Sequence, residues 1–221
     1  DGITAASDST MAVEFITITN NSGNGLTVLT GAPGGDVYLE ASIIADNGGN
    51  DCAGSNITSR GFNLVGDESN CVFTPAAGDL IGTGGSPIDP LLGPLQDNGG
   101  LTLTHAIGPG SPALDAAAAD QIRPCSDAND DQRGVARPQG PACDIGAFER
   151  AIPVGVLQTL IDTAATGTTI ELPDGTYSEL ITIGEGKTLR GSGPDNVIID
   201  ASNLNGSAIT ATGDFALEGI R

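Results

Sequence analysis

Two stretches of this chain, VEFITITNN at residues 13–21 and LEASIIADN at residues 39–47, align without a gap. Each opens with an apolar residue and Glu, continues through Ile mixed with Thr, Ser or Ala, and ends in Asn, and the second copy begins 26 residues after the first. Residues 217–220 indicate a third copy. Repeats of this length, built of short β-branched runs, are typical of β-solenoids, in which stacked coils bury an aliphatic column. A β-sandwich with a chance similarity remains the alternative.

Composition excludes several classes of partner. Asp and Glu number 28 against 8 Lys and Arg, so the net charge of −20 disfavours a nucleic acid or an anionic membrane as the partner. No run approaches the roughly 20 apolar residues of a membrane span. Because Asp1 does not open a signal peptide, we expect a mature product or an excised segment.

The four cysteines fall into two local pairs, Cys52 with Cys71 and Cys125 with Cys143, and each pair brackets a loop rich in Gly, Asn, Asp or Pro. Four cysteines allow three connectivities, of which we expect the local one. No pair has CxxC spacing and the only histidine, His105, is far from both pairs, so a zinc site is not expected. Paired, oxidised cysteines imply an extracellular setting.

Residues 156–164 carry apolar side chains at helical spacing, and Gly167 supplies a stop signal. Evenly spaced short strand patterns follow up to residue 212. A helix before such strands is how a solenoid starts, because the helix covers the apolar end and the unpaired edge of the first coil. The alternative, a packing helix of an α/β unit, requires a longer alternation of helices and strands than this chain contains.

The sequence therefore predicts an all-β protein with a right-handed parallel β-helix (β-solenoid), one short capping helix and a loop-rich module. We expect coils at residues 1–48. A loop-rich, disulfide-bearing module at 49–150 has too few apolar runs for a core of its own, so we expect it to wrap and close the end of the preceding coils. Residues 151–221 then supply the capping helix and the first coils of a second β-helix segment.

Ordered motifs support this organisation by resemblance. The chain contains, in this order, GFNL at 61–64, DPLLG at 89–93, DNGG at 97–100, GSPALD at 110–115, DQRG at 131–134 and CDIGAFE at 143–149. Through these motifs, residues 39–149 resemble the C-terminal region of bacterial surface β-helix proteins, the choice-of-anchor and polymorphic-outer-membrane-protein-like group. The later part contains GTY at 175–177 and LRGSG at 189–193. Through these two motifs, residues 152–221 resemble the N-terminal cap and first coils of right-handed parallel β-helices of the pectate-lyase-like superfamily.

The order of the two parts departs from that family, in which the cap precedes the coils and the DIGAFE motif comes near the end. Here the ending comes first. We therefore expect either one period of a tandem array or subunits that complete each other's solenoids end to end, with copies of the chain as partners. Such heterologous contacts generate a fibre. The expected assembly residues are Asp1, Ile3, Phe215, Leu217, Ile220 and Arg221.

Evidence for catalysis is weaker. The resemblance to polysaccharide lyases and hydrolases implies clustered carboxylates, and Glu14 and Glu40 are placed to stack on consecutive coils, where they also fit a solvated surface. No catalytic motif matches, so no catalytic residue is assigned, and His105 is expected to be structural. A polysaccharide-binding or polysaccharide-degrading β-helix module is the alternative function.

A structural Ca²⁺ is the one cofactor that the residues suggest. Asp127, Asn129 and Asp131 occupy alternate positions, and oxygen ligands at this spacing suit a hard cation. Gln132 and Pro138 stand where an EF-hand loop requires Gly and Glu, so the site would not be an EF-hand. The alternative is a solvated acidic turn paired with Arg133 or Arg137.

Overall fold

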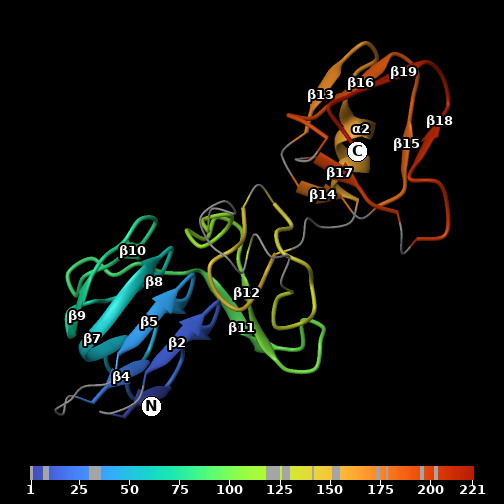
Figure 1. Ribbon diagram of the computed structural model, residues 1–221. Coiled ribbons are helices and arrows are strands. Elements are labelled where there is room, and N and C mark those ends of the chain that lie inside the picture. The colour runs from blue at the N-terminus through green and yellow to red at the C-terminus, as the bar shows by residue number, and fades with distance from the viewer. Residues whose placement is uncertain are drawn as a thin grey trace. The chain divides into compact units, whose positions relative to one another are not determined.

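A computed structural model describes residues 2–6, 10–29, 36–117, 125, 130–140, 142–150, 155–172, 175–177, 179–194, 197–201 and 204–221. These residues form mostly strands, with one helix among them (Figure 1). The chain divides into two compact units, residues 1–138 with 142–150 and residues 139–141 with 151–221. Each unit is described by itself.

Unit 1 contains rows of parallel strands made by successive passes of the chain. Each strand pairs with the strand at the same place in the next pass, as the arrows of β2, β5 and β7 show in Figure 1. Parallel neighbours need a long connection between them, and here the rest of each pass supplies it. The rows are β1 (Ile3–Ala5), β4 (Leu26–Val28), β7 (Cys52–Gly61) and β9 (Cys71–Thr74); β2 (Met11–Glu14), β5 (Val37–Glu40), β7 and β9; and β3 (Thr17–Ile18), β6 (Ile43–Ile44), β8 (Leu64–Val65) and β10 (Leu80–Ile81).

The repeat seen in the sequence is the pairing register of these strands. Val13 lies opposite Leu39 and Glu14 opposite Glu40 in β2 and β5, and Thr17 lies opposite Ile43 in β3 and β6. The expected stacking of Glu14 on Glu40 is therefore confirmed. The passes also continue beyond the expected limit at residue 48, since β7 to β10 extend them to Ile81.

Two cores lie on opposite faces of the row β3–β6–β8–β10. Ile44 and Val65 belong to the core enclosed by the passes. Ile43 and Leu64 point the other way, into a second core that includes Ile145 and neighbouring residues of the loop-rich module. Strands β6 and β8 are consequently buried on both faces, as is usual in parallel sheets.

The loop-rich module thus corrects one expectation. We predicted that it would close the end of the preceding coils, but it packs along the flank of several passes. Gly146 donates its N–H to the carbonyl of Ala41 (2.8 Å), and Ala147 donates to Oγ1 of Thr17 (3.0 Å). The physical reason is that consecutive apolar residues in a two-residue strand expose an outward face that needs cover. The regular element of the module is an antiparallel pair, β11 (Leu92–Gln96) and β12 (Thr104–Ile107).

Unit 2 repeats the parallel pattern over fewer passes. The helix α2 (Val156–Thr163) buries Leu157 and Ile161 in the core of this unit. All strand pairs of unit 2 are parallel. They are β13 (Thr169–Glu171) with β16 (Lys187–Arg190) and β19 (Phe215–Glu218), β14 (Gly175–Tyr177) with β17 (Val197–Ile199), and β15 (Ile181–Ile183) with β18 (Ile209–Ala211).

The helix α2 is held over the first pass by polar contacts at its N-terminus. Gly155, the N-cap residue, offers no side chain, and the buried carboxylate of Glu179 accepts the N–H groups of Leu157 (2.9 Å) and Gln158 (3.1 Å) instead. The Gln158 side chain accepts the N–H of Thr182 (2.6 Å) and donates to its carbonyl (3.0 Å). The helix therefore satisfies backbone groups of β15.

Candidate functional site

The expected assembly residues lie in both units. Asp1 is outside the described residues. Ile3 is half-buried and pairs with Leu26. Phe215 and Leu217 are exposed on β19, Ile220 is half-buried, and Arg221 exchanges backbone hydrogen bonds with β17.

Strand β19 ends a column of side chains that is well buried in the preceding passes. Ile170, Leu189 and Leu217 are register partners in β13, β16 and β19. Their exposed fractions are 8%, 0% and 43%. The helix α2 packs on the first pass, whereas no described strand covers Leu217 in the last pass. The apolar column is therefore exposed to solvent at β19.

The first pass of unit 1 is closed by comparison. Val13 and Ile18 lie on the outermost described pass, yet they are only 4% and 5% exposed. Ile3 and Met11 are half-buried at the same edge. Among the described residues, the apolar rows on the first pass of this unit therefore expose much less surface than Leu217 does.

A row of alternating charges runs beside the open column. Arg190 pairs with Glu218 (Nε to Oε2, 2.6 Å) and with Glu171 (Nη1 to Oε1, 3.0 Å), so one guanidinium bridges three successive passes. The hydrogen bond to Glu218 raises the pKa of Arg190 above its ordinary value. These side chains are exposed, so the row contributes more to register than to stability.

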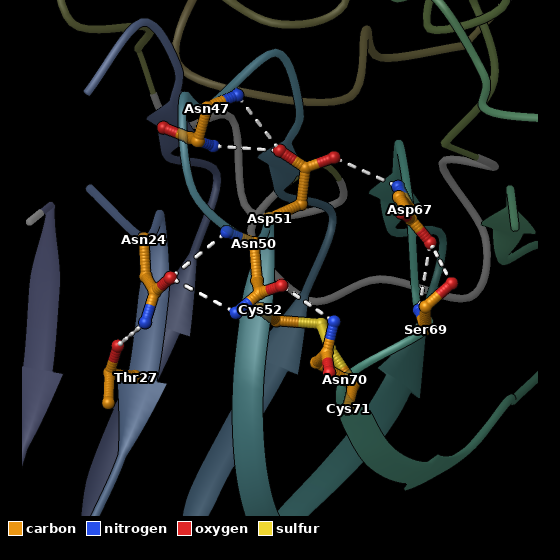
Figure 2. Close-up of a disulfide and its surroundings, with 10 residues drawn as sticks. All are labelled: Asn24, Thr27, Asn47, Asn50, Asp51, Cys52, Asp67, Ser69, Asn70 and Cys71. Atoms are coloured by element: carbon orange, nitrogen blue, oxygen red, sulfur yellow. Dashed lines mark hydrogen bonds between the residues drawn. A yellow bond between two sulfur atoms is a disulfide. The ribbon is translucent and has the colours of Figure 1, made fainter. Parts of the chain in front are cut away.

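Figure 2 shows a ladder of asparagine side chains across three passes of unit 1. Asn50 donates its side-chain amide to Oδ1 of Asn24 (3.2 Å), and Asn70 donates to Oδ1 of Asn50 (2.6 Å). Asn24 in turn donates to Oγ1 of Thr27 (3.1 Å). Repeated amides at the same turn thus link each pass to the next, as in other stacked-strand structures.

A second polar chain lies at the neighbouring turn. Asn21 donates to Oδ1 of Asn47 (2.9 Å), and Asn47 donates to Oδ1 of Asp51 (3.0 Å). The other oxygen of Asp51 accepts the N–H of Asp67 (2.9 Å). Hydrogen bonds from Ser69 hold the pKa of Asp67 below its usual value. The sequence did not predict either set of hydrogen bonds, although Asn21 and Asn47 occupy the same position of the aligned repeats.

Both expected disulfides are present. Cys52 is bonded to Cys71, which links β7 to β9 next to the asparagine ladder (Figure 2), and Cys125 is bonded to Cys143. The Cα–Cα distances are 5.4 Å and 6.1 Å. Disulfides persist in oxidising compartments, so the two bonds point to a non-reducing compartment such as the extracellular space.

The expected calcium residues fall only partly within the described chain. Asp127 and Asn129 lie outside it. Asp131 is buried, and its carboxylate accepts N–H groups of Glu149, Val135 and Arg133, including the Arg133 guanidinium (Nη2 to Oδ2, 2.6 Å). Burial raises the pKa of Asp131, but these hydrogen bonds outweigh it and hold the pKa below its ordinary value. The pairing with Arg133 agrees with one part of the alternative, the solvated acidic turn, but Asp131 is buried rather than solvated. The calcium site stays a prediction.

A buried ion pair lies next to that carboxylate. Arg137 contacts Glu149 (Nη1 to Oε2, 2.8 Å), donates to the carbonyls of Asp144 and Gly146, and stacks over the ring of Phe15 at 4.5 Å. Burial lowers the pKa of Arg137, against the attraction of Glu149. Burial also raises the pKa of Asp144 to about 6, although the N–H groups of Asp115 and Arg150 oppose the shift. The DQRG and DIGAFE motifs, with Arg137, therefore build a buried polar cluster, which we call the Arg137–Glu149 cluster. It attaches the module to the passes.

A groove of about 550 Å³ opens beside the Arg137–Glu149 cluster within unit 1. Glu14, Phe15 and Thr17 line it from the passes, and Asp130 and Gln132 line it from the module. Glu14 also pairs with Arg60 (3.4 Å) at the surface. Aromatic, carboxylate and amide groups thus meet in one depression.

His105 is placed as a structural residue. Its Nδ1 lies 2.8 Å from the carbonyl of Gly93, across the β11–β12 pair. No group of three or more His, Cys, Asp or Glu side chains arranged for a metal ion occurs in the part of the chain that the structure describes.

The chain matches no protein-family model, no curated protein and no solved structure in comparisons with each. No helix within the described ranges is long and apolar enough to cross a membrane.

Proposed function

We propose that this chain is a right-handed parallel β-helix protein of the bacterial surface group that its motifs resemble, and that it acts outside the cell. Parallel pairing of successive passes, the buried aliphatic column and the capping helix α2 support the architecture. The two disulfides support an extracellular location. The proposal assigns a mechanical role, in which each coil satisfies the backbone groups of the next.

In this proposal the protein stacks end to end with copies of itself into a surface fibre or filament. The observation that carries it is the column Ile170, Leu189 and Leu217, which is buried in two passes and exposed in the last. An exposed edge strand accepts another strand by main-chain hydrogen bonds, with side-chain pockets fixing the register. A further copy would cover Leu217 and extend the ladder, and a contact of this heterologous kind propagates.

The test is the dependence of particle mass on concentration. We expect light scattering to show growth with concentration, and negative-stain microscopy to show filaments. Leu217→Arg should abolish this growth by placing a charge in the contact. Leu160→Arg is the matched control, since Leu160 is similarly exposed but lies on α2, and it should assemble normally. A chain that remains a monodisperse monomer at high concentration contradicts the proposal.

The groove beside Phe15 favours a second candidate, a polysaccharide-binding or polysaccharide-degrading module. Its aromatic ring, carboxylates and amide are groups that commonly bind sugars, and Glu14 and Asp130 supply two acids. The test is incubation with polygalacturonate or alginate, with and without Ca²⁺. Binding or cleavage that Glu14→Gln abolishes would support this candidate, and no binding to either polymer would eliminate it for these substrates.

A further inference from the structure

Four Asn-Gly pairs occur in this chain, at residues 24–25, 47–48, 98–99 and 205–206. In such a pair the main-chain nitrogen of Gly can attack the side-chain carbonyl of the preceding Asn. Glycine has no Cβ, so it offers little steric resistance to the required conformation. The reaction needs a free glycine N–H and a mobile asparagine side chain, and the structure distinguishes the four pairs on both counts.

Two of the pairs are locked in turns of unit 1, one in the asparagine ladder and one in the neighbouring set of hydrogen bonds around Asn47. The N–H of Gly25 is bonded to the carbonyl of Asn50 (2.9 Å), and Asn24 is held through its side chain in the ladder. The N–H of Gly48 is bonded to the carbonyl of Asn21 (2.8 Å). Asn47 donates its side-chain amide to Asp51 and to the carbonyls of Ile18 and Ala45. In both pairs the attacking nitrogen and the carbonyl carbon are fixed in other contacts.

The third pair lies in a loop but is equally engaged. Asn98 donates its side-chain amide to the carbonyl (2.8 Å) and Oγ1 (3.1 Å) of Thr104. The N–H of Gly99 is bonded to Oδ1 of Asp97 (3.0 Å). The guanidinium of Arg133 also donates to the carbonyl of Asn98 (3.3 Å). Arg133 therefore anchors this loop to the Arg137–Glu149 cluster.

Among the described residues, the fourth pair has none of these restraints. Asn205 and Gly206 lie between β17 and β18 and are both exposed. Within the described part of the chain, neither the Asn205 side chain nor the Gly206 N–H has a hydrogen-bond partner. We propose that Asn205 is the site of spontaneous deamidation in the folded protein, and that the fold protects the other three pairs.

The chemistry balances without a cofactor. The Gly206 nitrogen, after losing its proton to solvent base, attacks Cγ of Asn205. The Cγ–Nδ2 bond breaks, ammonia leaves, and a five-membered succinimide forms. Water then opens the ring at either carbonyl and yields aspartate or isoaspartate. The net change consumes one water, releases one ammonia and adds a negative charge to the loop between β17 and β18.

The test is incubation of the folded chain in mildly alkaline buffer, followed by peptide mapping with mass spectrometry that separates aspartate from isoaspartate. We expect Asn205 to react at least about tenfold faster than each of the other three, because those react only after local opening. A reduced, urea-unfolded sample should bring the four rates together. Equal rates in the folded chain overturn the proposal, and so does a dominant Asn205 in the unfolded sample, since sequence alone would then explain it.

Asn205→Gln is the matched variant, because it keeps the amide but would need a larger, slower-forming ring. The mass change should disappear from this peptide, while the peptides of the other three pairs should be unaffected. Persistence of the change in the same peptide would show that another residue reacts, and would overturn the assignment to Asn205.

Discussion

The two units use the same parallel passes but protect them differently. In unit 1 the row β3–β6–β8–β10 is covered on both faces, by the column inside the passes and by the second core of the loop-rich module. In unit 2 one core lies under α2, and the last strand, β19, has exposed side chains along its length. The stability of a stack of short strands thus depends on what packs over its faces and ends. The two units differ in which strands lack such packing.

The polar links between passes follow the same division. Unit 1 joins its passes through an asparagine ladder and a disulfide, and a buried ion pair lies in the module that covers those passes. Unit 2 joins its passes through the exposed row of Glu171, Arg190 and Glu218. Buried links are costly to break because the remaining partner stays desolvated, whereas exposed links are replaced by water.

The largest expected effect is the loss of the buried ion pair in unit 1. Arg137→Ala leaves the carboxylate of Glu149 buried and uncompensated and removes the contact with Phe15. We expect a loss of about 3 to 5 kcal/mol in the free energy of unfolding of unit 1. Hydrogen exchange read peptide by peptide should show this loss in unit 1 and not in unit 2.

Arg60→Ala is a matched control for that prediction. Arg60 also pairs with a glutamate, Glu14, and stacks over an aromatic ring, that of Tyr38 at 4.5 Å, but on the surface. We expect a loss below about 1 kcal/mol. Equal losses for the two arginines would mean that burial does not explain the contribution of the Arg137–Glu149 cluster to stability.

The next effect compares two leucines of one column in unit 2. Leu189→Ala opens a cavity at a fully buried position and should destabilise unit 2 by about 2 to 5 kcal/mol. Leu217→Ala, at its register partner, should cost below about 1 kcal/mol in dilute solution. If copies stack at high concentration, the cost of Leu217→Ala should rise with concentration. A large, concentration-independent cost would mean that Leu217 is already covered.

The sequence predicted the part of the fold that repeats. Strand pairing between equivalent passes leaves its period in the chain, so the offset between residues 13–21 and 39–47 appears again as the register of β2 with β5 and β3 with β6. The helix was predictable because an amphipathic period has a clear signature. The disulfide pairing was predictable because the loop between the cysteines of each pair is short.

The second core was not predictable from such patterns. It gathers Ile107 from β12, and Ala113 and Ile145 from irregular segments, onto Ile43 and Leu64. Only the fold brings these residues together. Adjacent apolar residues in β6 and β8 were its one local signal, since they cannot both face a single core. The partners of Asp131 were likewise not predictable, because the sequence of an acidic turn is the same whether its carboxylates bind a cation or an arginine.

A smaller effect should appear as a pH dependence confined to unit 1. Burial raises the pKa of Asp144 to about 6, above that of the unfolded chain. Between about pH 4 and pH 6 the unfolded chain loses this proton and the native state keeps it, so the free energy of unfolding should fall as pH rises, by roughly 2 to 3 kcal/mol. Asp115, whose pKa burial also raises, adds a contribution of the same sign. Urea titrations across this window should show the decline.

Asp144→Asn supplies the control for the pH dependence. The amide keeps the shape and does not titrate, so most of the decline between about pH 4 and pH 6 should vanish. The remaining slope should come from Asp115 and Asp46, whose pKa values burial also raises. An unchanged profile in Asp144→Asn would assign the dependence to other groups.

The smallest expected effect concerns the end of unit 2 that α2 covers. Glu179→Gln removes a negative charge and one of two acceptors from the N-terminus of α2, where the carboxylate meets the N–H groups of Leu157 and Gln158. We expect a loss of about 1 to 2 kcal/mol, with faster hydrogen exchange in α2 and β15, because the helix dipole loses a nearby negative charge and one of the two orphan N–H donors loses its acceptor. Glu185→Gln removes the same charge from an exposed position and should change stability by less than about 0.5 kcal/mol. If the two variants behave alike, the covering of β15 by α2 depends on apolar packing of Leu157 and Ile161 rather than on this cap.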